Sequence, residues 1–108
     1  MKTNYQALLS KQDPAPFFER WRGGQAAFWN YTVSHRVLEL RVTLRGKPGH
    51  LSIYCGDVQH LHGPTKWSNC DFELARRGVD EVVLLDQPAG VEVCAGIVGV
   101  EEMPEPAT

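Results

Sequence analysis

The sequence has little excess charge of either sign, few cysteines and no long hydrophobic run. Its 11 basic and 13 acidic side chains leave a formal net charge of -2. Nucleic-acid binders usually carry a strong basic excess, because phosphate neutralisation provides most of their affinity. No apolar stretch approaches the roughly 20 residues that a membrane-spanning helix needs, and the first residues lack the apolar core of a signal peptide. We therefore expect neither nucleic acid nor a membrane as a partner.

The chain of 108 residues contains only 3 cysteines, which is an odd number. An odd count in a chain without an export signal favours reduced thiols, so the expected compartment is the cytoplasm. A chain of this length is close to the commonest size of a single domain and can bury a stable core without disulfide bonds or bound metals. We expect one domain over residues 1–102, followed by a flexible tail at 103–108 that is rich in acid and proline.

The first 24 residues carry signals for two short helices. Thr3–Gln6 fits a capping box, in which the threonine and glutamine side chains each satisfy a free amide at the start of a helix. Asp13–Pro14 offers a second start, because aspartate can cap a first turn and proline fits within it. Gly23–Gly24 then predicts the end of this second helix.

Beyond residue 26 the hydrophobic period changes to two, which is typical of strands with one wet face. The alternation is clearest at 37–44, and the preceding strand places Trp29, Tyr31 and Val33 between polar residues, so a tight hairpin is expected. The predicted fold class is α+β. It consists of two short N-terminal helices followed by a six- to seven-stranded, mostly antiparallel sheet, arranged as a sandwich or a partly open barrel.

The C-terminal half shows one central strand and one change of parity. Residues 82–85 are apolar on both faces, which favours a strand in the middle of a sheet. The apolar parity then shifts from Val91 and Val93 to Val98 and Val100. An extra residue at Ala95–Gly96 would produce this shift within one strand, so the pattern predicts a bulge there.

Metal-ligating residue types gather between Cys55 and Cys70. Thiolate and imidazole are the ligands that zinc and related transition metals prefer, and four of them close a tetrahedral site. In one interpretation, a zinc-like ion is held by Cys55, His60, His62 and Cys70. In the other, the chain holds no cofactor, since both cysteines have the parity of core residues and no Cys-x-x-Cys knuckle is present.

No complete catalytic motif is present in the sequence. It lacks a phosphate-binding glycine loop, a Gly-x-Ser-x-Gly elbow and a His-Glu-x-x-His helix. Nucleophile, base and oxyanion roles cannot all be assigned, so an enzyme is the less favoured class. The predicted function is a non-enzymatic binding or protein-interaction domain, whose partner is an unknown protein or a second copy. The alternative is a small metal-binding protein that uses the Cys55–Cys70 segment.

Candidate binding residues come from an aromatic cluster and from a long connection. Seven of the ten aromatic residues lie in the first 31 residues. Among them Trp21 is flanked by arginines and Phe28 falls on an otherwise polar face, which is typical of interface anchors; alternatively, these rings pack the helices on the sheet. The connection runs from Asp57 to Trp67 and is longer than the usual connection of about two to six residues between strands. Long loops of this kind often carry function. The candidates in this connection are Asp57, His60, His62 and Trp67.

Overall fold

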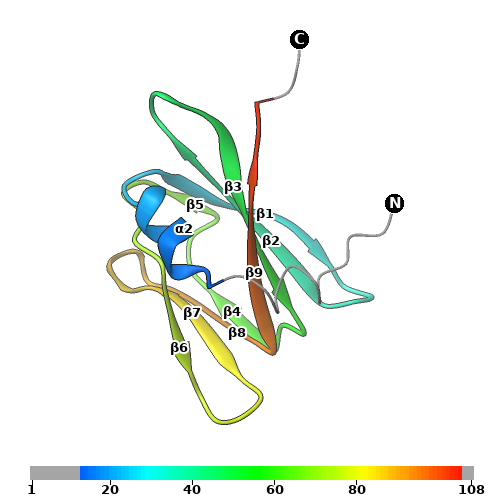
Figure 1. Ribbon diagram of the computed structural model, residues 1–108. Helices are drawn as coiled ribbons and strands as arrows, with labels where there is room; N and C mark the ends of the chain where they lie inside the picture. Colours follow the sequence, from blue (N-terminus) through cyan, green and yellow to red (C-terminus); the bar gives the residue numbers. More distant parts are fainter. Residues whose placement is uncertain (1–12, 106–108) are drawn as a thin grey trace.

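The computed structural model describes residues 13–105, so the first expected helix, near Thr3–Gln6, lies outside the described residues. The second expected helix is present as α2, Ala15–Arg20 (Figure 1). Oδ1 of Asp13 accepts the N–H of the first helical residue at 3.1 Å, and Gly23 takes a left-handed φ of 88° shortly after the helix ends. Within this part of the chain, no helix is long and apolar enough to cross a membrane.

Nine strands follow α2 in the described residues and form two open antiparallel sheets. One sheet has the order β5-β1-β2-β3-β9 and the other has the order β4-β8-β7-β6. The strands are β1 (Gln25–Thr32), β2 (Val37–Leu44), β3 (Lys47–Gly56), β4 (His60–His62), β5 (Lys66–Trp67), β6 (Glu73–Arg76), β7 (Val82–Asp86), β8 (Val91–Ala95) and β9 (Ile97–Met103), with a short 3-10 turn, Gln87–Ala89, after β7.

The mostly antiparallel prediction is confirmed, but the expected count of six or seven strands is too low for the nine that the described residues form. Two of the additional strands, β4 and β5, contain 3 and 2 residues. Segments this short show no measurable period in the sequence. Neighbours in the sheets bring them into register, and residue propensities alone do not indicate them.

One cluster of buried side chains lies between the sheets and takes residues from both. In β2, Leu38, Leu40 and Val42 are at most 2% exposed, so the alternation predicted at 37–44 is confirmed. The neighbouring strand β3 pairs Ile53 with Leu40, and β7 lies inside its sheet, as its two apolar faces predict. Burying one such side chain contributes roughly 1.5–3 kcal/mol relative to exposure. This core fixes the orientation of the outer faces.

The chain crosses from one sheet to the other at Gly96. Strand β8 ends at Ala95 in the four-stranded sheet, and β9 begins at Ile97 in the five-stranded sheet. The N–H of Gly96 donates to the carbonyl of Gly56 at 3.0 Å, and a Cβ here would lie only 3.2 Å from the Cβ of Asp57. The parity shift read from the sequence therefore marks a change of sheet. The bulge expected within a single strand is wrong.

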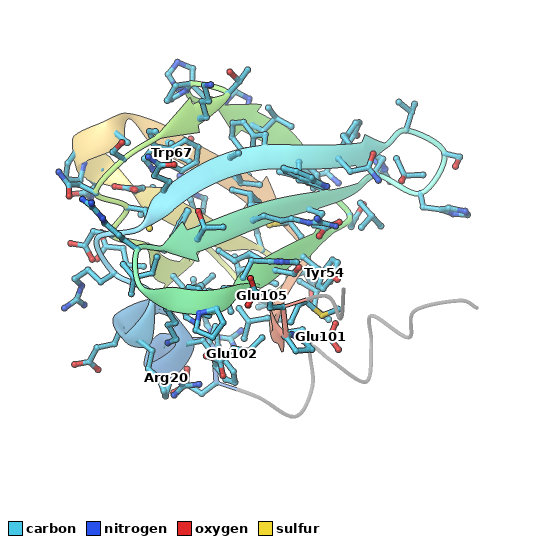
Figure 2. All side chains as sticks on the ribbon, turned by 90° about the horizontal axis from the view of Figure 1, so that it is seen from above. Arg20, Tyr54, Trp67, Glu101, Glu102 and Glu105 are labelled. Carbon is cyan, nitrogen blue, oxygen red and sulfur yellow. The ribbon has the colours of Figure 1, made fainter. Side chains whose placement is uncertain are left out.

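Helix α2 joins the two sheets between β6 and β9. The indole N–H of Trp21 donates to Glu102 of β9 at 2.7 Å, and Arg20 pairs with the same carboxylate at 3.1 Å (Figure 2). Phe18 packs against Phe72, which directly precedes β6, with ring centroids 5.8 Å apart. A six-residue helix is not stable alone in water, so these contacts hold it in place.

Candidate binding site

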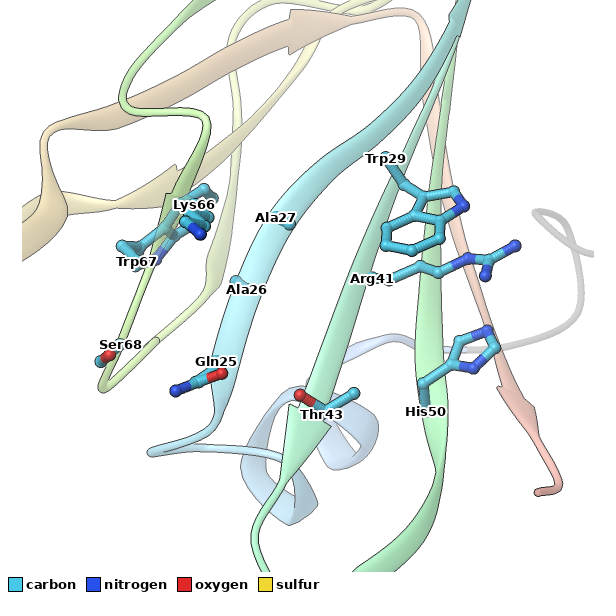
Figure 3. A pocket seen from close by; sticks show the side chains of 10 residues that line it. All are labelled: Gln25, Ala26, Ala27, Trp29, Arg41, Thr43, His50, Lys66, Trp67 and Ser68. Carbon is cyan, nitrogen blue, oxygen red and sulfur yellow. The ribbon is translucent and has the colours of Figure 1, made fainter.

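A hollow of about 510 Å³ opens on the outer face of the five-stranded sheet, away from the core (Figure 3). Its floor is low because Ala27 presents only a methyl group there, while the neighbouring Ala26 is 2% exposed and belongs to the core. Ala27 pairs with Arg41 of β2, so the first wall rises directly beside this floor. The first wall comprises Trp29, Arg41 and His50, the second comprises Lys66, Trp67 and Ser68, and Gln25 and Thr43 complete the lining.

The first wall is built across three neighbouring strands. The guanidinium carbon of Arg41 lies 4.3 Å from the ring centroid of Trp29, a cation–π contact. Nε of Arg41 donates to Glu39 at 2.8 Å, and the hydroxyl of Ser52 donates to the same carboxylate at 3.1 Å. Arg41 is therefore fixed from two sides. Trp29 is nonetheless 58% exposed, and since Arg41 covers one face of its ring, the other face is open.

The second wall is anchored by a buried carboxylate. The indole N–H of Trp67 donates to Oδ2 of Asp86 at 2.7 Å, and the backbone N–H of Asp71 donates to the same oxygen at 3.0 Å. Asp86 is 0% exposed, and charge-assisted hydrogen bonds of this kind are stronger than neutral ones. The ring of Trp67 also lies edge-on to Phe28, with centroids 5.6 Å apart. The second wall is thus held by the core.

The lining of the hollow carries positive charge, of which Glu39 balances the part that belongs to Arg41. Arg41 and Lys66 are cationic, and none of the lining residues is acidic. Lys66 forms no ion pair within the described residues. Burial, together with the nearby charge of Arg41, lowers the pKa of His50, which keeps its imidazole neutral near pH 7. The hollow therefore favours an anionic group over a cationic one.

Strand β1 borders the hollow and is only partly covered by its neighbour. Strand β5 pairs with it at Ala26 and Ala27, and the N–H of Phe28 donates to the carbonyl of Thr65 at 2.9 Å. Beyond Phe28, no strand of the described residues lies on this side of β1. Residues 29–32 are all exposed. The second half of β1 is therefore a sheet edge.

Large apolar side chains are exposed along this edge and at the hairpin that follows. Trp29, Tyr31 and Val33 are 58%, 39% and 75% exposed. A register shift between Phe28 and Asn30 leaves Trp29 as an extra residue opposite β2. Up to Trp29 the strand alternates, with Ala26 and Phe28 on the core side; after the bulge Asn30 lies opposite Glu39 and Tyr31 opposite Leu38, because an extra residue resets which face each following residue occupies. The simple alternation expected for this strand is therefore wrong.

The three aromatic residues predicted to bind occupy different environments. Trp21 is 2% exposed and lies under the ammonium of Lys47, which is 4.2 Å from its ring centroid. Phe28 is half-buried against the core. Trp67 is also half-buried, yet it lines the hollow. The open aromatic surface is consequently centred on Trp29, which the sequence analysis did not single out.

The polar residues predicted from the long connection lie apart from the hollow. Asp57 has a φ of 54° and pairs with Arg36 at 3.0 Å. His60 and His62 are exposed on β4, which belongs to the four-stranded sheet. A ring nitrogen of His62 lies 3.1 Å from the carbonyl of Gly90. None of these three predicted residues lines the hollow.

The four predicted metal ligands are not gathered in the structure. Cys55 and Cys70 are 0% and 1% exposed, and burial raises the pKa of their thiols to about 12 and about 11. His60 and His62 lie on the surface of β4. Across residues 13–105, no group of three or more histidine, cysteine, aspartate or glutamate side chains is placed to hold a metal ion. The burial of both thiols agrees with the core interpretation.

Most residues of the site were not predicted from the sequence, among them Trp29, Arg41, Lys66 and Asp86. Trp29 was not predicted because it lies at a bulge, and Arg41 has the pattern of an ordinary charged residue on the solvent-exposed face of a strand. Asp86 did leave a signal, because it follows four consecutive apolar residues with which it shares a strand. A carboxylate at that position is rarely buried unless it is hydrogen-bonded.

No family model, no curated protein and no solved structure matches this chain. The hollow, its two walls and the open edge of β1 are therefore the features on which a function can be based.

Proposed function

We propose that this chain is a non-enzymatic protein-interaction domain that binds an extended segment of its partner along the open half of β1. The observation that supports this most directly is the composition of the edge. Residues 25–33 contain no charged residue and no proline. Natural sheets usually protect their edges with charge, proline, a bulge or a covering element, because unpaired N–H and C=O groups recruit other chains. Of these devices, this edge has only the bulge at Trp29.

Binding in this mode combines two sources of free energy. Backbone hydrogen bonds between the partner and the edge provide affinity, while pockets for alternate side chains provide specificity. After the bulge, residues 30–32 pair regularly with β2, so their backbone is straight enough to accept a further strand. The hollow beside them is the pocket, and Trp29 is an exposed anchor of the kind that dominates interface energetics. In this proposal the two sheets act as the layers of a sandwich that holds the edge rigid.

A charge placed on the edge tests this function. Peptides selected from a random library against the protein should shift NMR amide signals within β1 and around the hollow. Tyr31→Lys should weaken their binding at least about tenfold, since lysine on an edge opposes strand addition. The matched control is Val79→Lys, at a site that is 91% exposed in another turn. If Val79→Lys weakened binding equally, or if the shifts mapped to α2 or β6, the edge would not be the binding surface.

The metal-binding alternative remains a separate proposal, supported by the residue types between Cys55 and Cys70. It requires a rearrangement that exposes both thiols, because they are buried. Elemental analysis of protein purified without chelator tests it directly. Near-stoichiometric zinc that disappears in a His60→Ala, His62→Ala double variant would support it, and protein free of metal would refute it.

A further inference from the structure

We infer that the partner segment is acidic: it adds to the open half of β1 as an extended strand and places a carboxylate in the hollow between Arg41 and Lys66. This inference rests on the proposed function and specifies the chemistry of the partner. It depends on two observations that are independent of each other, the line of the open edge and the charge of the hollow beside it.

The edge determines where the partner's side chains lie. Strand β5 runs antiparallel to β1, with Lys66 opposite Ala27 on the outer face of the sheet. A segment that lies beside Asn30 continues the line of β5 past the point where β5 ends. Successive side chains of a strand alternate between faces, and every second one lies about 7 Å farther along the same face. Alternate side chains of the partner therefore line up on the outer face, next to Lys66 and Trp29.

The charge of the hollow selects among such segments. Lys66 has no acidic partner within residues 13–105. Arg41 gives only Nε to Glu39, so its terminal nitrogens keep donors available. Because no lining residue is acidic, a carboxylate in the hollow meets Lys66 and the terminal nitrogens of Arg41, whose charge Glu39 balances in part, whereas a lysine there meets like charge. Neutral His50 adds a polar group without adding charge.

The open face of Trp29 adds an apolar contact for the neighbouring side chain of the segment. Trp29 stays in place because Arg41 stacks on its other face. The partner that fits is thus an extended stretch that alternates acidic and aliphatic residues. A basic stretch of the same shape is excluded by charge repulsion, which gives the site its specificity.

Three blocked peptides of about six residues test the inference, each alternating valine with glutamate, with glutamine or with lysine. Binding is measured by NMR titration of the labelled protein at low salt. The glutamate peptide should bind about threefold to tenfold more tightly than the glutamine peptide, the range expected for one or two exposed ion pairs. The lysine peptide should bind most weakly. The preference for glutamate should fade near 1 M salt, where exposed charges are screened.

Charge variants identify the cations responsible. Lys66→Gln should reduce the ratio of the affinity for the glutamate peptide to the affinity for the glutamine peptide. The matched control is Arg76→Gln, which removes one unit charge from β6 in the other sheet and should leave the preference intact. If both variants reduced the preference equally, the effect would come from net charge and the inference would fail.

The outcomes separate the inference from the proposed function. Equal binding of all three peptides along β1 would overturn the acidic partner and leave the edge as a binding surface. A dimer detected by light scattering and dissociated by Tyr31→Lys would assign the edge to a second copy, which also overturns the acidic partner. If no peptide bound and the chain stayed monomeric, both the inference and the proposed function would be refuted.

Discussion

Asp86 offers the sharpest test of how the second wall of the hollow is held. It is 0% exposed, and its Oδ2 accepts both the indole N–H of Trp67 and the backbone N–H of Asp71. Asp86→Ala leaves both donors without an acceptor, at a cost of about 1–3 kcal/mol each. Removing a buried charge whose Oδ1 has no partner among the described residues offsets part of this cost. We expect a net loss of about 2–4 kcal/mol.

Urea unfolding at neutral pH, followed by tryptophan fluorescence, measures this loss. The matched control is Asp71→Ala, because Asp71 carries an exposed carboxylate paired with Arg22, and exposed pairs contribute less than about 1 kcal/mol. Asp86→Asn keeps the shape and one acceptor oxygen, so it should cost less than the alanine variant. A loss below about 1 kcal/mol for Asp86→Ala, or a loss equal to that of the control, would refute the anchoring role.

Three further predictions concern the rest of the fold. Hydrogen bonds from Arg20 and Trp21 lower the pKa of Glu102, so its contribution to stability is present above the unfolded pKa near 4.5 and is lost as the pH falls through the lower folded pKa. Glu102→Gln should therefore lower the free energy of unfolding by about 1 kcal/mol at neutral pH, after allowance for the exposure of the side chain. A difference in stability from the unmodified chain that persisted in urea unfolding near pH 3 would contradict this. All 3 thiols are buried, so a chromogenic thiol reagent near pH 8 should react slowly with the folded chain and count 3 thiols after unfolding; one rapidly reacting thiol in the folded chain would disprove it. Leu40→Ala should cost about 2–5 kcal/mol in urea unfolding, because Leu40 is 0% exposed; a cost as small as that of Val79→Ala would place Leu40 outside the core.

The strands that the sequence predicted well are those whose side-chain alternation is uninterrupted. Strand β2 shows it over its whole length, and Leu38, Leu40 and Val42 are buried as expected. Strand β1 fails because the bulge at Trp29 changes the parity within the strand. A bulge depends on the pairing of two strands, so the sequence of one strand does not reveal it.

The candidate site was only partly predictable for the same reason. Trp67 was found because it is an isolated aromatic residue beside polar ones, and it does line the hollow. Lys66 and His50 come from strands that meet β1 and β2 through pairings the sequence does not specify. The burial of Cys55 and Cys70 followed from their parity, whereas the grouping of four metal ligands rested on nearness in sequence, which the structure does not convert into nearness in space.

The bond between Trp21 and Glu102 joins residues 81 apart in the chain. A ribosome synthesises α2 before β1 to β9, whereas the carboxylate that holds α2 in place lies in β9, the last of these strands to be made. Phe18 and Trp21 therefore have no docking site while most of the domain emerges, although both are at most 5% exposed in the folded protein. Contacts this distant in sequence slow folding, and newly made chains pass through a stage with uncovered aromatic side chains, which is when chaperones bind and aggregation begins.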